Sequence, residues 1–178
     1  MEPGALETGL RSMNNSVFSR STLKTALVTV PIILGLGFLM GQLSNSGYGN
    51  DWFDALDKPA AMPPGWAFGA AWSVLYILLG IAVAIVWNAP AWRARSAGLT
   101  LFLIQLALNF AWSPVFFAAH RVALALAVIV AMLLLSAAMT AFFARIRPLA
   151  AWLMAPYLAW LGFAAYLNYG ILRLNPVG

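Results

Sequence analysis

Five uncharged apolar runs, each long enough to cross a lipid bilayer as a helix, constrain the fold of this chain more than any other feature. They occupy residues 25–43, 65–87, 97–119, 122–143 and 149–172. A helix needs about 20 apolar residues to span the hydrocarbon core. Because that core holds no water for exposed backbone groups, a helix must satisfy its own hydrogen bonds. The pattern predicts an all-α membrane protein, a bundle of five transmembrane helices.

The composition supports lipid as the outer solvent. Hydrophobic residues make up 63% of the chain and charged residues only 8%, against roughly 45–50% and 25% in soluble domains. The net charge of +5 sits at the ends of the runs, where basic residues report membrane orientation. We therefore expect membrane lipid as a partner and no nucleic acid. The chain has no cysteine, which excludes disulfides and thiolate metal sites.

The basic residues divide unequally between the two sides of this bundle. Seven fall on the side of the N-terminus and three on the other: Arg11, Arg20, Lys24, Arg93, Arg95, Arg145 and Arg147, against Lys58, Arg121 and Arg173. For an inner membrane, this bias predicts a cytoplasmic N-terminus.

Two longer segments lie outside the runs. Residues 1–22 are polar and predict a disordered tail before a single membrane domain, residues 23–178. Residues 44–64 form the one long connector, in which Asn50 or Asp51 can cap a short helix. We interpret this connector either as a lid over the bundle or as an inert interfacial segment. The candidate lid residues are Trp52, Lys58, Pro59, Pro63 and Pro64.

The predicted spans lack the residues that ordinary enzymatic catalysis requires. The spans contain no charged side chain, which disfavours an ion channel or proton pump. Their neutral polar groups supply no acid–base pair, nucleophilic triad or metal-ligand cluster, so we expect no catalytic residue of these kinds, no metal and no required cofactor. The single histidine, His120, lies at a helix corner beside Arg121 and is interpreted as a surface residue rather than a haem ligand.

Three tryptophans lie deep inside three different runs: Trp72, Trp112 and Trp160. An indole N–H at that depth needs a partner or a cavity, because lipid tails offer neither. Helical spacing places each tryptophan on one helix face with further candidate binding residues. Tyr76 shares a face with Trp72, Asn109 and Phe116 with Trp112, and Ala164 and Leu167 with Trp160. These faces either line one small-molecule pocket or serve interhelical packing.

Prolines and small residues add detail. Pro114 and Pro156 lie within runs and predict bends near Phe110 and Trp152, because proline removes a backbone hydrogen bond and crowds the preceding turn. Gly37 and Gly41 form a small-residue stripe suited to close helix contact. A homodimer is one arrangement that such stripes allow.

Three stretches resemble the translocator protein family, which includes the tryptophan-rich sensory proteins called TspO. WFDALDKP at 52–59 with PPGWAFGAAWSVLY at 63–76 is similar to its first loop and second helix. QLALNFAWSPVFF at 105–117 is similar to its third helix, and residues 156–169 to its fifth. One departure is Ala61, where the family usually has tryptophan.

The resemblance implies an integral membrane protein, here expected to be bacterial, that forms a five-helix bundle, often dimeric. It implies binding of porphyrins or haem precursors, sterols and benzodiazepine-type drugs, with porphyrin or haem as ligand rather than cofactor. The implied ligand-binding positions are Trp72, Tyr76, Asn109, Trp112, Phe116, Trp160, Ala164 and Leu167. Leu167, Tyr169 and Arg173 match the family's sterol motif, a weak pattern.

Three functions stay open at this point. The first is a sensor or translocator of porphyrin-type molecules. The second, also implied by the resemblance, is light-dependent porphyrin degradation, with Trp72 and Trp160 as the redox-active positions. The third is a membrane scaffold without ligand, which would use the same aromatic residues only for packing.

Overall fold

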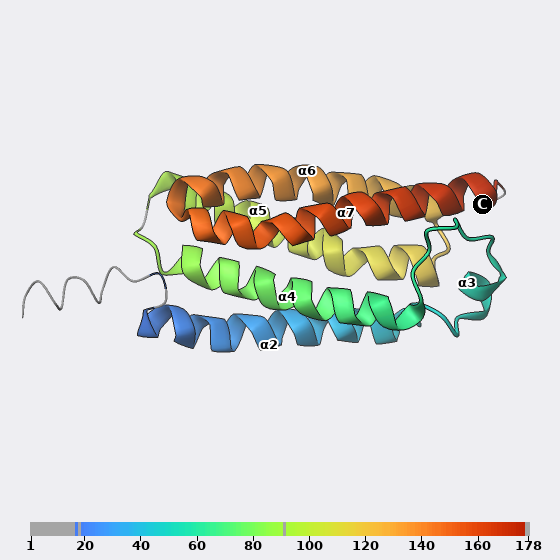
Figure 1. Cartoon of the computed structure of the whole chain (residues 1–178), viewed down its shortest axis with the longest axis horizontal. Coiled ribbons are helices and arrows are strands. Elements are labelled where there is room, and N and C mark those ends of the chain that lie inside the picture. Colours follow the sequence, from blue (N-terminus) through green and yellow to red (C-terminus); the bar gives the residue numbers. More distant parts are fainter. Residues whose placement is uncertain (1–16, 18, 91, 177–178) are drawn as a thin grey trace, which may run out of the picture.

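The computed structural model describes residues 17, 19–90 and 92–176, and shows a bundle of long helices (Figure 1). Five of the described helical segments are long and apolar enough to cross a membrane, which confirms the predicted fold class. They are α2 (Arg20–Leu43), α4 (Gly65–Trp87), α5 (Arg93–Ser113) with its π-helical continuation η1 (Pro114–Ala118), α6 (Val122–Ile146) and α7 (Pro148–Leu174). The short α3 (Asp51–Ala55) lies in the connector between α2 and α4.

Several helices extend beyond their predicted ends. Helix α2 begins at Arg20 because the Ser19 hydroxyl caps it, accepting a hydrogen bond from the Thr22 amide at 3.2 Å. Residues 20–22 therefore belong to α2, and residues 1–16 of the predicted tail lie outside the described residues. Helix α5 begins at Arg93 rather than residue 97. The apolar runs end at the first charge, whereas the helices continue past it.

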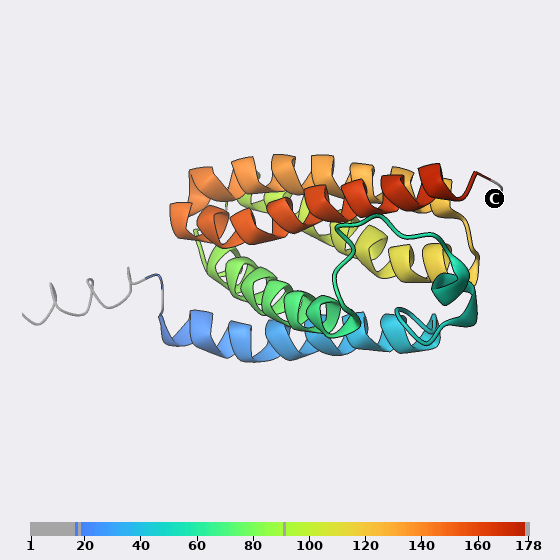
Figure 2. The same ribbon diagram turned by 45° about the vertical axis from the view of Figure 1, so that its right-hand side comes forward.

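The helices pack mainly against their sequence neighbours. Helix α6 packs on both α5 and α7, and these three helices form one group. Helices α2 and α4 form a second group, which contacts the first mainly where α4 packs on α7. All five run along the long axis of the molecule, and α3 lies at the end where the C-terminus emerges (Figures 1 and 2). The core between them is filled by large apolar side chains, among them Leu79, Met139, Phe143 and Met154.

Helix α2 is attached to α4 by a close backbone approach at Gly80. The Thr29 hydroxyl donates to the Gly80 carbonyl at 2.9 Å. A Cβ atom on Gly80 would lie only 2.9 Å from the Val30 Cα, so no larger residue fits without moving the helices apart. The remaining faces of α2 are open, and Leu27 is 75% exposed. Lipid covers such faces in a membrane protein.

Pro114 changes the third span from α-helix to π-helix. The α-helical hydrogen bonding of α5 ends at Ser113, and the Ala119 amide donates to the Pro114 carbonyl five residues earlier at 2.9 Å. A π-helical turn is wider than an α-helical one and often occurs at functional sites. Here it contains Phe116 and Phe117, both buried. The sequence predicted a bend near Phe110, and the change in hydrogen bonding lies at Pro114 itself.

Candidate ligand-binding cavity

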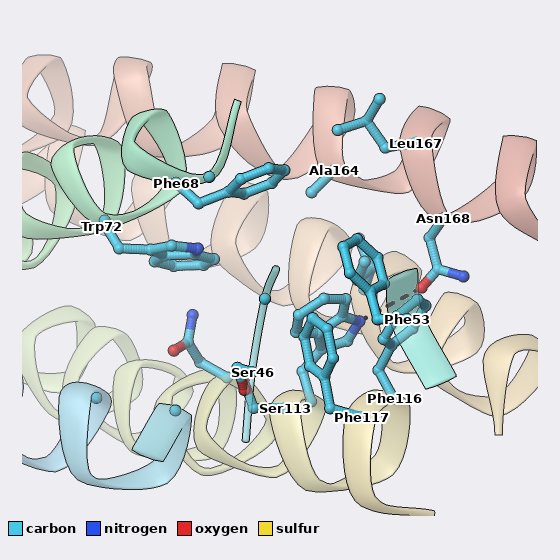
Figure 3. A pocket seen from close by; sticks show the side chains of 18 of the residues that line it. Ser46, Phe53, Phe68, Trp72, Ser113, Phe116, Phe117, Ala164, Leu167 and Asn168 are labelled. Carbon is cyan, nitrogen blue, oxygen red and sulfur yellow. Dashed lines mark hydrogen bonds between the residues drawn. The ribbon is translucent and has the colours of Figure 1, made fainter. Parts of the chain in front are cut away.

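A cavity of about 410 Å³ lies at the α3 end of the bundle. Its walls come from α2, α4, α5, η1, α6 and α7, and from the connector that contains α3 (Figure 3). The structure brings all eight predicted binding positions together on it: Trp72, Tyr76, Asn109, Trp112, Phe116, Trp160, Ala164 and Leu167. The volume is within the range of small-molecule sites, about 300–1,000 Å³.

One wall of the cavity is aromatic. Trp72 and Trp160 meet edge to face, with ring centroids 6.3 Å apart, and Phe68 meets Trp160 in the same way at 5.9 Å. Figure 3 shows Phe68 and Trp72 projecting from α4 into the space that Ala164 and Leu167 border from α7. An edge-to-face contact covers one face of only one of the two rings, so this wall still presents flat apolar surface to a ligand.

The polar floor of the cavity is formed by Tyr76 and Asn109, which begin a chain of hydrogen bonds that continues into the bundle. The Tyr76 hydroxyl donates to Asn109 Oδ1 at 2.7 Å, Asn109 Nδ2 donates to the Tyr157 hydroxyl at 3.0 Å, and Tyr157 donates to Gln105 Oε1 at 2.7 Å. All four side chains are buried. This chain of side chains links α4, α5 and α7, and satisfies groups that lipid could not. We call it the polar chain.

Two glycines of α2 shape the opposite wall. A Cβ atom on Gly37 would lie 2.7 Å from Tyr76 Cζ, so only glycine allows the Tyr76 ring to reach Asn109. A Cβ atom on Gly41 would meet nothing within 4 Å, although Gly41 also lines the cavity. The stripe predicted to serve helix contact therefore accommodates a side chain at one position and leaves open space at the other.

The α3 end of the cavity, here called its mouth, is lined by a second aromatic cluster. Trp112 stacks on Phe116 with centroids 5.1 Å apart, and Phe53 of α3 packs on Phe117 at 5.2 Å. Trp112 also donates its indole N–H to Asn168 Oδ1 at 3.4 Å. The width of the π-helical turn thus places two phenylalanines where α3 can rest on them.

The connector between α2 and α4 is fastened to α7. The Asn50 side chain caps α3 by accepting from the Phe53 amide at 3.1 Å. The Asp57 amide donates to Asn175 Oδ1 at 3.1 Å, and Asn175 Nδ2 donates to the Asp57 carbonyl at 2.9 Å. Pro59 lies against Gly170, where a Cβ atom would approach its ring to 3.0 Å. These contacts hold the connector over the cavity mouth.

The predicted lid residues differ from those that line the cavity. Phe53 and Met62 of the connector line it, whereas the five predicted lid residues do not. Trp52 instead stacks on His120, with centroids 4.2 Å apart and planes 12° from parallel. His120 is an exposed corner residue, as predicted, with a left-handed backbone (φ 56°). Ala61 is exposed beside the lining residue Met62.

The residues of the predicted sterol motif face in different directions. Leu167 is buried and lines the cavity. Tyr169 is 50% exposed and Arg173 is exposed on the outside of α7. A single ligand in the cavity would therefore contact Leu167 and neither of the other two.

The cavity carries no ionisable charge. None of its lining residues is Asp, Glu, Lys, Arg or His, and the described residues contain no cluster of potential metal ligands. Four buried polar atoms have no hydrogen-bond partner among the described residues: Trp160 Nε1, Gln105 Nε2, Ser136 Oγ and, at the other end of the bundle, Arg95 Nε. Apolar contact and neutral hydrogen bonds are the chemistry this site offers.

Sequence reasoning missed the part of the cavity that comes from α2, from the connector and from Phe68. The missed residues of α2 include Gly37, Phe38, Gly41 and Gln42. A signal for Phe68 was present, because it lies one helical turn before Trp72. No comparable signal marked Met62, whose position depends on how the connector folds over the mouth.

Asn175→Ala is expected to loosen the connector, because it removes both hydrogen bonds to Asp57. Hydrogen exchange of backbone amides in residues 51–62 should accelerate several-fold, since segments with few tertiary contacts open most easily. Asn88→Ala, which removes side-chain hydrogen bonds at the opposite end of the bundle, serves as the control. Equal exchange of residues 51–62 in both variants would show that Asn175 does not fasten the connector.

Comparison with known proteins gives a consistent family. The model of the TspO/MBR family matches residues 27–174. The human translocator protein is 39% identical over 142 residues, which covers 79% of this chain and 84% of that protein. The tryptophan-rich sensory protein of Cereibacter sphaeroides is 40% identical over 127 residues, 71% of this chain and 78% of its own length. Protein CrtK of Rhodobacter capsulatus is 37% identical over 126 residues, covering 70% and 79%.

Proposed function

The chain belongs to the TspO/MBR family of integral membrane proteins, and on that premise we propose that it binds porphyrin-type tetrapyrroles in the cavity, acting as a sensor or translocator of them. The observation that carries this proposal is the cavity itself. It combines flat aromatic surface from Trp72 and Trp160 with an uncharged polar floor. A flat, largely apolar macrocycle is complementary to such a site, because buried apolar area contributes about 25 cal/mol per Å².

The polar groups of the site support the orientation of such a ligand. Asn109, a polar residue of the lining, can meet neutral polar atoms at its edge. No cation lies in the lining, and a buried unpaired carboxylate is costly. Ionised substituents of a porphyrin would therefore stay at the mouth, where Lys58 lies with its ammonium 4.7 Å from the Phe53 ring centroid.

The names of the relatives support transport or sensing as the role. One is called a translocator protein and another a tryptophan-rich sensory protein. We extend the proposed ligands to sterols and benzodiazepine-type drugs, which are also apolar and fit a neutral cavity. The proposal includes a bacterial host and a cytoplasmic N-terminus, the latter from the distribution of basic residues. A homodimer through an open helix face is compatible with this role.

The alternative of porphyrin degradation rests on the placement of Trp72 and Trp160. Both line the cavity, with ring centroids 6.3 Å apart, so a ligand there would contact both indoles. This contact would be needed for a light-driven reaction that uses tryptophan as the redox partner. Binding leaves the porphyrin intact, whereas degradation yields a new compound, so one absorbance experiment distinguishes the two.

The test is a titration of the detergent-purified protein with protoporphyrin, in the dark and under illumination. We expect a saturable shift of the porphyrin absorbance band and quenching of tryptophan fluorescence, with the spectrum unchanged after illumination. A new absorbing product that forms only in light and only with protein would favour the enzyme. No shift and no quenching would leave a scaffold without ligand and contradict the proposal.

A further inference from the structure

The end of the bundle away from α3 carries charge of one sign. Asn88 Nδ2, just after α4, donates to the Thr25 hydroxyl near the start of α2 at 2.8 Å, which places these two helix ends together. The start of α5 and the turn between α6 and α7 lie at the same end (Figure 1). Six cations of the described residues gather there: Arg20, Lys24, Arg93, Arg95, Arg145 and Arg147.

The opposite end is electrically balanced. It carries three cations, Lys58, Arg121 and Arg173, and all three acidic residues within the described part of the chain, Asp51, Asp54 and Asp57. No described carboxylate is therefore left to pair with the six cations. The excess of positive charge belongs to one end alone.

Three of these arginines surround the junction of α5 with α6 and α7. A Cβ atom on Gly98 would lie 3.2 Å from the Phe143 ring, so the first turns of α5 pack on the last turns of α6. Arg93 begins α5, Arg145 lies in the last turn of α6, and Arg147 precedes α7. Arg95 differs, because its guanidinium donates to two carbonyls of the preceding turn, those of Trp87 and Ala89, at 3.3 and 2.9 Å. Arg147 makes one longer bond of this kind, from Nη1 to the Ile146 carbonyl at 3.4 Å, which leaves its other donors available.

The backbone at this junction also favours an anion. Helices α5 and α7 both begin here, and neither has a side-chain cap or an acidic residue in its first turn. Amides in the first turn of a helix lack intrahelical partners, and the helix dipole makes that end positive. Acidic residues in the first turn usually compensate this positive charge. Arginines lie there instead. Helix α7 contributes few amides, because Pro148 has no N–H and the Ala150 amide donates to the Arg147 carbonyl at 2.9 Å. The guanidinium groups and the first amides of α5 together favour an external anion.

Exposed tryptophans place this junction at the level of lipid headgroups. Trp87 ends α4, Trp92 precedes α5, and Trp152 lies near the start of α7. They are 60%, 51% and 75% exposed. Tryptophan concentrates at the boundary between hydrocarbon and headgroups, which is where lipid phosphates lie.

We propose that this junction binds the phosphate of anionic phospholipids, with Arg93, Arg145 and Arg147 as its cations and the uncapped first-turn amides of α5 as further donors. The site is separate from the cavity and does not depend on the proposed ligand. It also goes beyond the orientation rule, which concerns insertion and requires no bound lipid. Clusters of basic residues beside a transmembrane helix recognise anionic headgroups in this way.

The test measures lipid binding by native mass spectrometry of the delipidated protein in neutral detergent. The probes are dioleoylphosphatidylglycerol and, for comparison, dioleoylphosphatidylcholine. We expect at least about a tenfold preference for phosphatidylglycerol at low salt, weakening as salt screens exposed charge. Arg145→Gln should reduce that preference about fivefold, and Arg93→Gln/Arg145→Gln should abolish most of it.

Arg121→Gln is the matched control, because Arg121 lies at the other end of α6 and is also exposed. It should retain the preference. The proposal is wrong if the wild type binds both lipids equally, or if Arg121→Gln and Arg145→Gln lose the preference alike. Millimolar inorganic phosphate that displaces phosphatidylglycerol completely would likewise overturn it in favour of a site for free anions. A thermal melt of each variant checks folding, and Arg147→Gln replaces any variant that fails to fold.

Discussion

Gly41→Phe is expected to weaken porphyrin binding at least about tenfold, equivalent to about 1.4 kcal/mol, while leaving the fold intact. The Cβ position of Gly41 faces open space on the cavity wall, with nothing within 4 Å. A phenyl group there would occupy volume that the ligand needs, without entering the packed core. Absorbance titration gives the affinity, and circular dichroism with a thermal melt checks the fold.

Gly35→Phe on the same helix is the matched control. Gly35 also has nothing within 4 Å of its Cβ position, but it is exposed and outside the lining. Both variants carry the same cost of exchanging glycine for phenylalanine in a helix. If the two lose affinity equally, the loss reports a general effect on α2 and the ligand does not occupy this cavity.

The second large effect concerns the polar chain. Asn109→Leu removes the acceptor of the Tyr76 hydroxyl and one donor to Tyr157. A buried polar group left without a partner costs about 1–3 kcal/mol, so the free energy of unfolding should fall by about that amount. Unfolding in detergent, followed by near-ultraviolet circular dichroism, measures it.

A double-mutant cycle separates the hydrogen bond from general packing. Tyr76→Phe/Asn109→Leu replaces both partners by apolar groups, which is far less costly than orphaning one of them. We expect the double variant to be more stable than the sum of the single losses predicts, by about 0.6 kcal/mol, the average coupling measured for hydrogen bonds within a membrane protein, and by at most about 1.7 kcal/mol. Strict additivity would mean that Tyr76 and Asn109 are not coupled.

The fold was largely predictable because length and hydrophobicity decide it. A long uncharged run has essentially one stable conformation in lipid, so the five spans follow directly. Helix ends were less predictable. Arg93 and Arg145 belong to helices that continue beyond the hydrocarbon, whereas a rule based on uncharged runs stops at the first charge.

The cavity was predictable where side chains are unusual for their depth. Trp72, Asn109 and Trp160 lie well inside spans, and helical spacing placed their neighbours on the same faces. The contribution of α2 was not predictable, because glycine looks the same in sequence whether a neighbour fills its space or none does. Gly37 accommodates the Tyr76 ring and Gly41 faces the open cavity, and only the packed structure distinguishes them.

The connector shows a different limit. Its short helix followed from Asn50 and the pattern of aspartates and apolar residues, and Asn50 does cap α3. Which face of α3 meets the cavity was not predictable, because it depends on Asn175 and Gly170, more than a hundred residues later in the chain. Phe53 therefore lines the cavity, and Trp52 lies outside on His120.

The central claim, that buried tryptophans of the cavity hold the ligand, is tested most directly by comparing four single variants in the same porphyrin titration. Trp72→Phe and Trp160→Phe should each weaken binding by about 1–3 kcal/mol, because each removes apolar contact area from the ligand, and each should reduce fluorescence quenching. Trp87→Phe and Trp92→Phe, whose indoles are 60% and 51% exposed at the other end of the bundle, should bind porphyrin as the wild type does. Equal affinities for all four variants would contradict the claim and leave interhelical packing as the role of Trp72 and Trp160.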